Sequence, residues 1–428
     1  MPMAESMGGV VMPAEEGTPE LAGCPRILDC FVEDLHRLGV VGEDRLAKLA
    51  FLTGNSRFLD RPLSVVVKGP SSAGKSFTVE TTLKFFPEHA FIRRTAMSPR
   101  ALVHTEEDFA HRILVIAEAA GIQGETGDLL LRSLLSEGCL QYETVEKTDG
   151  GQFKSRLIKK KGPTGVIITT TAIHLHPENE TRIISVPVDD TPEHTREVFR
   201  AIASRERELV SDSSLLQPWH DLHRWLERGV HKVVVPFADE LAESIPPSAT
   251  RLRRDFTSLL SVIKANALLH QANRKKVNGA VMATLDDYRV AFELLSDLLA
   301  EVVEQTISQN VREVVKAVGE LLRETRAGHV SQRQLASRLG LDKSTVSRRV
   351  AQAIDGGFLR NEERRDGMPA RLAPGDPLPT DEGVLPTPEA LERFINRCTV
   401  APDSKCNEEA QQGVMEERLR PQPKEGGS

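Results

Sequence analysis

The sequence has few cysteines and no long apolar run. Its five cysteines are scattered along 428 residues, and no two of them form a C-x-x-C pair. That usage predicts a reducing compartment, without disulfides or a zinc site. No apolar stretch approaches the roughly 18 residues of a membrane-spanning helix, and the N-terminus has no signal-peptide pattern. We therefore expect a soluble, cytoplasmic protein with no membrane partner.

The chain also lacks a large net charge. Its formal value is −7, with acidic tails at both ends and basic clusters between them. Because local patches set the electrostatic footprint, a mildly acidic total does not exclude a nucleic-acid partner. The length suffices for two or three domains of ordinary size. Residues 1–26 show no periodicity and are predicted to be disordered, whereas an amphipathic helical pattern begins at Ile27.

A glycine-rich motif follows the β-branched run Val65–Val67 and leads into a helix. Its residues are Gly69, Pro70, Ser71, Ser72, Ala73, Gly74, Lys75, Ser76 and Phe77. The pattern G-x-x-x-x-G-K-[ST] between a strand and a helix is the phosphate-binding P-loop, in which backbone N–H groups and the helix dipole face the anion. Lys75 would reach the β- and γ-phosphates and Ser76 would ligate Mg²⁺. The motif predicts binding of ATP with Mg²⁺.

An aliphatic run at residues 113–116 ends in Ala117 and Glu118. A buried parallel strand reads as such a run, and an acidic residue at its carboxyl end would lie beside the P-loop. We predict that Glu118 contributes to the metal site and polarises the attacking water. Ala117 stands where most such ATPases have an Asp, so either Ser76, phosphates and water hold the metal or hydrolysis is weak. A solvated strand-end acid is the alternative for Glu118.

A β-hairpin is predicted for residues 139–161. Residues 139–146 alternate as a strand does, Asp149-Gly150-Gly151 is a turn signal, and residues 153–161 return as a basic strand. Its candidate DNA-binding cations are Lys154, Arg156, Lys159, Lys160 and Lys161. Projected together, they would face a phosphate backbone. Lysines on an edge strand also serve to prevent aggregation, and charge alone does not separate the two roles.

These motifs, with the Thr169-Thr170-Thr171 strand end and the segment 179–186, resemble an AAA+ ATPase. The layout is similar to minichromosome-maintenance-type helicases and to helicase-like replication proteins of bacterial mobile elements. The resemblance implies an α/β core with a parallel sheet and a helical lid, and a hairpin that contacts DNA in a central channel. It implies that Thr170 occupies the sensor-1 position, where many relatives have Asn.

The same resemblance assigns two arginines. Arg182, on the strand that follows, matches the arginine finger that reaches the nucleotide of a neighbouring subunit, which implies a homo-oligomeric ring. A guanidinium there is worth roughly a thousandfold or more in rate. In the arginine-led helix after residue 249, Arg254 fits the sensor-2 position best and Arg251 next. Surface charges are the alternative reading of both sites.

Near the C-terminus, two short helices joined by a glycine turn predict a helix-turn-helix over residues 331–350, and two strands around a basic turn follow. Together they resemble a winged helix of bacterial regulators. The candidate DNA-binding residues are Lys343, Ser344, Thr345, Ser347, Arg348, Arg349 and Arg365. Similar folds also bind proteins.

The predicted organisation is a tail (1–26), an AAA+ core (27–205) with the hairpin (139–161), a helical lid with its connecting segment (206–310), a winged helix (311–375) and a mostly disordered tail (376–428). One short helix around residues 389–396 is predicted to interrupt that last tail. The function we predict is an ATP-dependent motor on single- or double-stranded DNA, a helicase or replication-initiation ATPase. One alternative is a transcriptional regulator whose assembly is switched by nucleotide binding. The other is a loader or remodelling ATPase.

Overall fold

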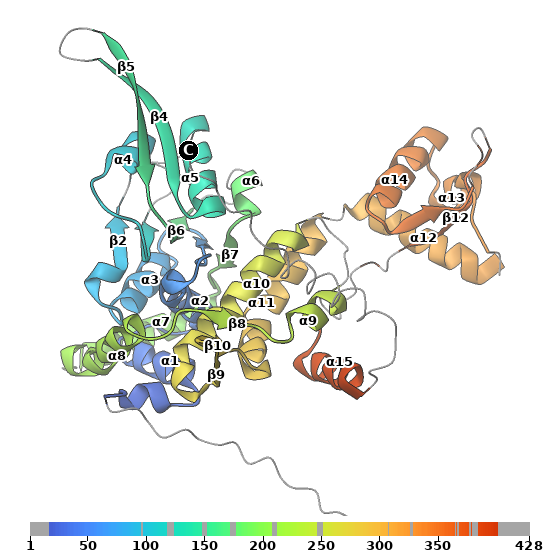
Figure 1. The fold of residues 1–428 in the computed structure, drawn as a ribbon. Helices are drawn as coiled ribbons and strands as arrows, with labels where there is room; N and C mark the ends of the chain where they lie inside the picture. Colours follow the sequence, from blue (N-terminus) through green and yellow to red (C-terminus); the bar gives the residue numbers. More distant parts are fainter. Residues whose placement is uncertain are drawn as a thin grey trace, which may run out of the picture.

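The strand that precedes the P-loop lies inside a five-stranded parallel sheet (Figure 1). The fold is that of a computed structural model, which describes residues 17–400 except 96, 118–123, 148–151, 172–176, 208–211, 246–250, 307, 326–327, 364, 366–367, 376–377 and 379–383. Across the sheet the strands are β2 (Phe91–Arg94), β3 (Arg112–Ile116), β6 (Thr164–Thr170), β1 (Val65–Lys68) and β7 (Ile184–Pro187). The register sets Lys68 beside Thr170 on one side and Pro187 on the other.

Helices cover both faces of this sheet, because alternate side chains of each strand point to opposite faces. Val65 and Val67 join one apolar cluster and Val66 joins the other. The helices of the first face include α1 (Ile27–Arg37), α2 (Asp44–Asn55) and α3 (Lys75–Leu83), and those of the second are α4 (Pro99–His104) and α5 (Glu125–Glu137). Short elements are η1 (Glu20–Gly23), η2 (Ser56–Phe58), η3 (Glu88–Ala90) and α6 (Pro177–Glu180). The predicted α/β class is confirmed.

The predicted hairpin is present and stands away from the sheet (Figure 1). Strands β4 (Leu140–Lys147) and β5 (Phe153–Lys160) pair antiparallel along their whole length. Both ends meet at one point, because a Cβ on Gly162 would lie 1.8 Å from the carbonyl oxygen of Gly138. The hairpin therefore begins at the C-terminal end of α5 and returns directly into β6.

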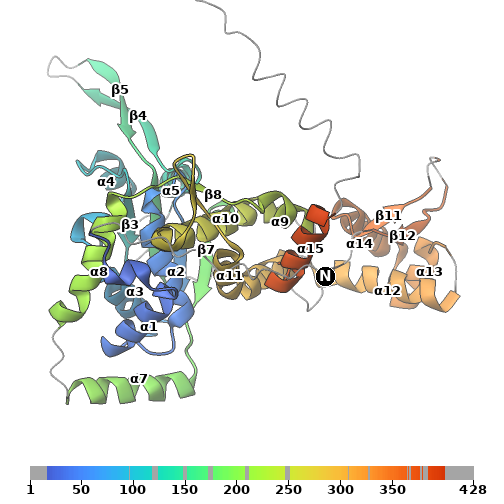
Figure 2. The ribbon, with the colours of Figure 1, turned by 60° about the horizontal axis from the view of Figure 1, so that its bottom comes forward.

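A helical region follows the sheet. Its elements are α7 (Pro192–Arg205), α8 (Asp212–Glu227), α9 (Ala238–Ser244), α10 (Leu252–Leu269), η5 (Gln271–Asn273) and α11 (Leu285–Thr306), with a small sheet ordered β8 (Val233–Val234), β10 (Ala280–Met282), β9 (Lys276–Val277). Figure 2 shows α7 running along the outside of the core. Asn55 Nδ2 donates to the carbonyl of Ala265 at 2.7 Å, which fastens α10 to α2.

The C-terminal unit has its own core and the expected helix-turn-helix. It consists of α12 (Gln309–Thr325), α13 (Gln332–Leu339), α14 (Lys343–Asp355), β11 (Leu359–Asn361) and β12 (Leu372–Pro374). Val314, Val346 and Val350 are buried there, and Leu252 from the start of α10 packs into the same cluster. This contact seats the winged-helix-like unit against the lid.

Two terminal segments are packed more firmly than their sequences indicate. In the N-terminal part that lacks periodicity, Ala22 of η1 is fully buried. Helix α15 (Pro388–Val400) buries Leu391, and the hydroxyl of Tyr288 donates to the carbonyl of Pro386 at 2.5 Å. Within the residues that the structure describes, no helix is long and apolar enough to cross a membrane.

Candidate functional site: a nucleotide loop, an arginine cluster and a basic hairpin

The P-loop curls between β1 and α3 as its glycines predict. Gly74 precedes α3 with a φ of +79°, and Ser72 has a φ of +68°. A Cβ on Gly74 would meet nothing within 4 Å, so conformation rather than space favours glycine there. The first N–H groups of α3 have no partner within the helix and face the loop, which makes the site suited to phosphate.

Lys75 is held inside this loop. Its Nζ donates to the carbonyl oxygens of Gly69 at 2.8 Å and Pro70 at 2.5 Å, and its side chain is buried. Ser76 and Phe77 are exposed at the start of α3. The Lys75 ammonium and the unpaired N–H groups at the start of α3 can donate to a nucleotide phosphate, and the exposed Ser76 hydroxyl can ligate Mg²⁺.

One wall of the loop comes from distant residues that the sequence does not reveal. A Cβ on Gly69 would lie 2.3 Å from Cγ2 of Val188, which follows β7. The next N–H, of Asp189, donates to Glu43 Oε1 at 2.9 Å, and His194 Nε2 lies 3.8 Å from the same oxygen. Burial raises the pKa of the Glu43 carboxyl. Because 146 residues separate Glu43 from Asp189, no local pattern predicts their contact.

The sensor-1 candidate, Thr170, lies at the end of the strand beside β1, and its role stays a prediction. Thr170 ends β6 directly beside Lys68, one residue before the P-loop, and its side chain is buried. Thr169 Oγ1 donates to the carbonyl of Ala117, so the ends of β3 and β6 are tied together. Glu118 lies outside the described residues, and its role at the metal stays a prediction. No cluster of three His, Cys, Asp or Glu side chains suited to a metal occurs in the described ranges.

Arg182 lies in the turn between α6 and β7, and not on a strand as the sequence predicts. Pairing of β7 begins only at Ile184, opposite Val65. Arg182 Nε donates to Ser136 Oγ at 2.7 Å, at the last turn of α5, and its Nη1 donates to the carbonyl of Glu178. The backbone N–H of Arg182 donates to the carbonyl of Asn179 at 3.0 Å, which closes the turn, and the two side-chain acceptors hold the guanidinium.

The lid arginines meet the same segment. Arg254 Nη1 donates to Thr181 Oγ1 at 2.6 Å, and Arg251 Nη2 donates to the carbonyl of Glu180 at 3.2 Å. Lys68, the last residue of β1, forms an ion pair with Glu180. We call residues 177–182 the α6 segment. It connects the lid helix α10 to the strand that leads into the P-loop.

Arg182 lies close enough to two other guanidinium groups to feel their charge. Burial, and then the positive charges of Arg254 and Arg132, lower the pKa of Arg182. Like charges held together favour an anion between them. Nearby, burial raises the pKa of Asp255 to about 6, and this carboxylate lies 3.6 Å from Arg251 Nε. Sequence reasoning finds Arg182 and Arg254 but misses Arg132, which looks like any helix surface charge.

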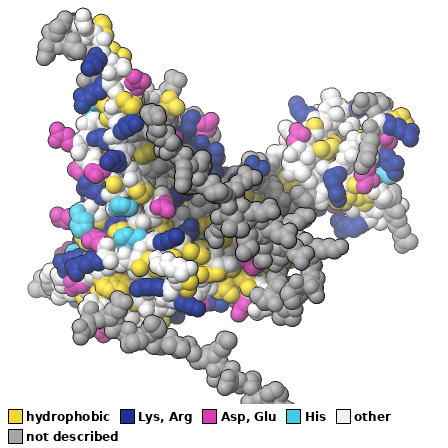
Figure 3. Space-filling view, in the orientation of Figure 1, with side chains coloured by type: hydrophobic (Ala, Val, Ile, Leu, Met, Phe, Trp, Pro, Cys, Tyr) yellow, Lys and Arg dark blue, Asp and Glu magenta, His cyan; other side chains and the backbone are white. Residues whose placement is uncertain are grey.

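The hairpin displays most of its predicted cations. In Figure 3 lysine and arginine side chains follow the projecting hairpin. Lys154, Arg156 and Lys159 are exposed, as is Lys161 just beyond β5. Lys160 is an exception, because its Nζ donates to the carbonyl of Thr105 at the hairpin base. The exposed apolar residues Val145, Leu157 and Phe153 lie among these charges, and Phe153 is 76% exposed.

The predicted DNA-binding residues of the winged-helix-like unit divide into two groups. Asp342 Oδ1 accepts from the backbone N–H groups of Ser344 and Thr345, both at 2.9 Å, and so starts α14. The exposed members are Lys343, Ser344, Ser347, Arg348 and Arg365, and Thr345 is half-buried. Arg349 instead turns toward α12, where it pairs with Glu313 at 2.8 Å. Arg348 is therefore better placed than Arg349 to reach DNA.

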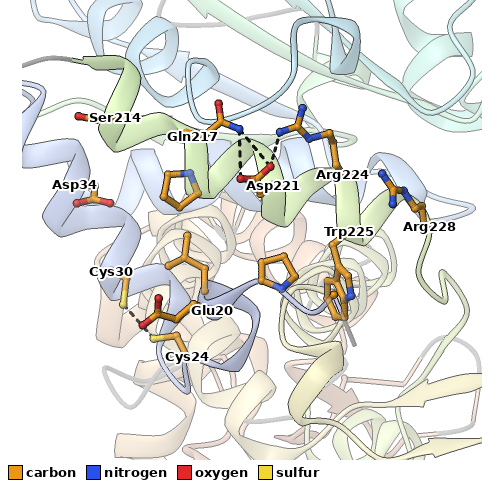
Figure 4. Close-up of a pocket in the computed structure, with 14 residues that line it drawn as sticks. Glu20, Cys24, Cys30, Asp34, Ser214, Gln217, Asp221, Arg224, Trp225 and Arg228 are labelled. Carbon is orange, nitrogen blue, oxygen red and sulfur yellow. Dashed lines mark hydrogen bonds and ion pairs between the residues drawn. The ribbon is translucent and has the colours of Figure 1, made fainter. Parts of the chain in front are cut away.

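A hollow of about 1080 Å³ lies apart from these sites, between η1, α1 and α8 (Figure 4). Cys24 and Cys30 lie in its wall with their sulfurs 3.1 Å apart, and Trp225 and Arg228 lie across from them. Burial raises the pKa of Cys30 to about 11. None of the predicted site residues lines this hollow.

Comparison with known proteins finds one family model and several solved structures. Residues 319–367 match the model of the MarR family. Among solved structures, a full-length MCM homologue from Methanopyrus kandleri is 16% identical, over 66% of this chain and 60% of that one, with a TM-score of 0.42. The present chain thus spans 60% of that protein's length. No curated protein matches the sequence significantly.

Two further solved structures resemble the chain at lower scores. A RuvB variant from Thermotoga maritima is 14% identical over 76% of this chain and 91% of that one, with a TM-score of 0.27. The Aeropyrum pernix Orc1 protein in complex with DNA is 13% identical over 90% and 98%, with a TM-score of 0.26. Likenesses at these scores carry no argument about this chain. The parallel sheet with its P-loop, hairpin and helical region is the arrangement that the AAA+ resemblance of the sequence implies, and the MarR match marks the C-terminal winged-helix segment.

Proposed function

We propose that this chain is an ATP-dependent motor that acts on DNA, a helicase or replication-initiation ATPase of bacterial or mobile-element origin. One observation carries the proposal: strand β6 joins the two sites. Its first residue, Thr164, follows the hairpin base, and its last, Thr170, lies beside the strand end that opens into the P-loop. A motor needs such a rigid link between nucleotide and track.

ATP would be held by the P-loop N–H groups and Lys75, and Mg²⁺ by Ser76 with Glu118. When bound, they supply an activated phosphoryl group whose transfer to water releases free energy. Lys75 would exchange its two carbonyl acceptors for phosphate oxygens. Thr170 would position a water or a phosphate oxygen from the adjoining strand end. With Ala117 in place of the usual Asp, we expect slow basal turnover.

Arg182 would act on the nucleotide of a neighbouring subunit, in a homo-oligomeric ring. Arg182 lies just before Ile184, where β7 begins. The P-loop begins after Lys68, which pairs with Pro187 at the other end of β7, about 10 Å further along the strand. Arg254 holds the same segment through Thr181, so it would approach the same neighbour's phosphates. Burial and then repulsion from Arg254 and Arg132 lower the pKa of Arg182, and that anion would relieve the repulsion.

DNA would be engaged at two places. The hairpin offers Lys154, Arg156 and Lys159 on a projecting ribbon, which suits a strand passing through a ring. The winged-helix segment offers Arg348 on α14, which suits duplex DNA. Both contributions would weaken with salt, because phosphate contacts release counterions.

The test is ATP hydrolysis by the full chain with and without single- and double-stranded DNA. We expect hydrolysis that DNA stimulates, lost in Lys75→Ala and kept in the matched control Lys276→Ala, an exposed lysine of β9. Lys154→Ala combined with Lys159→Ala should keep basal hydrolysis, lose DNA stimulation, and reduce the salt dependence of DNA binding by about two phosphate contacts. ATP binding without turnover under any of these conditions would overturn the motor.

The match of residues 319–367 to the MarR family favours a second candidate, a winged-helix regulator whose assembly is switched by nucleotide. A single high-affinity duplex site, bound without unwinding, would distinguish this regulator from the motor. The absence of any salt-sensitive binding to DNA would exclude both the motor and the regulator.

A further inference from the structure

Helix α5 carries a stripe of polar side chains along the α6 segment. Asp128 Oδ1 accepts from Asn179 Nδ2 at 3.1 Å, Arg132 forms an ion pair with Glu178, and Ser136 Oγ accepts from Arg182 Nε at 2.7 Å. Residues four apart lie on one face of a helix, so these contacts follow one line about 12 Å long. Three attachments spread over that length fix both the position and the direction of the α6 segment against α5.

The same helix ends at the base of the hairpin. Gly138 caps α5 with a φ of +65°, and Ser133 Oγ donates to the carbonyl of Cys139 at 3.2 Å. The carbonyl of Gly138 approaches Gly162 so closely that no Cβ would fit there. Leu134 and Leu140 are buried in one cluster. Helix α5 and both ends of the hairpin therefore form one rigid corner.

The far side of the α6 segment faces the nucleotide machinery. Lys68, next to the P-loop, pairs with Glu180, and Arg254 of the lid holds Thr181. Arg182 belongs to the same segment. A displacement of this segment would be transmitted to α5 through the stripe contacts, and by α5 to the base of the hairpin.

We propose that Arg132 is a positioning residue that couples the α6 segment to the hairpin, so that movement of Arg182 against a neighbour's nucleotide turns α5 and moves the hairpin on DNA. The inference rests on the proposed motor function. Arg132 lies at the centre of the stripe, where its side chain is 26% exposed and forms an ion pair, between hydrogen bonds that each join one charged and one neutral side chain. Strand β4 is about 23 Å long from Leu140 to Lys147, so a rotation of about 5° at its base moves the hairpin tip by about 2 Å.

The primary test compares Arg132→Gln with wild type and with Arg289→Gln, which removes an exposed i,i+3 ion pair on α11. In Arg132→Gln we expect loss of DNA stimulation, while the KM for ATP stays within about twofold because the P-loop is untouched. Arg289→Gln should behave as wild type. The charge exchange Arg132→Glu with Glu178→Arg should restore stimulation, a result that a merely destabilised helix would not give. Undiminished DNA stimulation in Arg132→Gln would overturn the proposal.

A second readout separates this inference from the motor itself. Amide hydrogen exchange is measured with and without a non-hydrolysable ATP analogue, over residues 140–147 and 153–160 and over residues 177–182. In wild type the analogue should change exchange in both regions, and in Arg132→Gln only in residues 177–182. An unchanged hairpin in wild type, or an equal hairpin response in Arg132→Gln, would overturn the coupling whether or not the protein hydrolyses ATP. If Arg132→Gln does not fold, Glu178→Gln removes the same pair from its more exposed side.

Discussion

The buried carboxyl of Asp255 makes a quantitative prediction about the lid helix. Its pKa rises from 3.8 to about 6 because burial outweighs the attraction of Arg251. A folded-state pKa above the unfolded value means that the folded protein binds the proton more tightly. The resulting stabilisation is complete below the unfolded pKa and is lost as the pH rises through the folded pKa. In full it amounts to about 3 kcal/mol, of which about 1 kcal/mol is present at pH 5 and absent at pH 7.5.

Asp255→Asn removes this titration and nearly keeps the shape of the side chain. Other groups titrate in the same interval, so the measured quantity is a difference of differences: the free energy of unfolding in urea, at pH 5 and pH 7.5, for wild type and variant. Lowering the pH should favour wild type over Asp255→Asn by about 1 kcal/mol. Asp239→Asn, an exposed site on α9, is the matched control and should follow wild type. Equal pH dependence in Asp255→Asn and wild type would refute the assignment of a buried, proton-binding carboxyl.

Three further predictions concern the loop, the winged-helix segment and the hollow. Gly74→Ala places a side chain at a φ of +79°, which costs about 1–2 kcal/mol of strain. The variant loop relieves this strain when ATP is absent and has to restore it on binding, so calorimetry should show ATP binding weakened by about 5- to 30-fold. Arg348→Ala should lower the salt slope of DNA binding by about one and leave the melting temperature unchanged. Arg349→Ala should instead lower the melting temperature. The reverse pattern would contradict the placement of these two side chains. Oxidised glutathione should join Cys24 and Cys30 in a disulfide, seen by mass spectrometry as a loss of about two hydrogens. The reaction should be faster at pH 9 than at pH 7, because burial raises the pKa of Cys30. The control variant Cys24→Ser should not show this mass loss.

The local parts of the nucleotide site follow from the sequence because their signals are local. The spacing of Gly69, Gly74 and Lys75 encodes a phosphate-binding loop, in which the φ of Gly74 favours glycine, and the aliphatic runs encode strands buried on both faces. The hairpin follows from a turn signal between two alternating segments, and the structure pairs them in full. The prediction that Arg182 lies on a strand is wrong, because β7 pairs with β1 only from Ile184 onward.

The sequence by itself therefore determines which elements form and which carry phosphate-binding or cationic side chains, since turn chemistry and residue periodicity act over a few neighbours. The tertiary structure alone decides which of them meet. It places Val188 against Gly69, ties Arg254 to the segment of Arg182, withdraws Arg349 from the surface and sets Arg132 between the α6 segment and the hairpin. These contacts join residues far apart in the chain, and their positions depend on how the sheet and its helices pack, which no local pattern encodes.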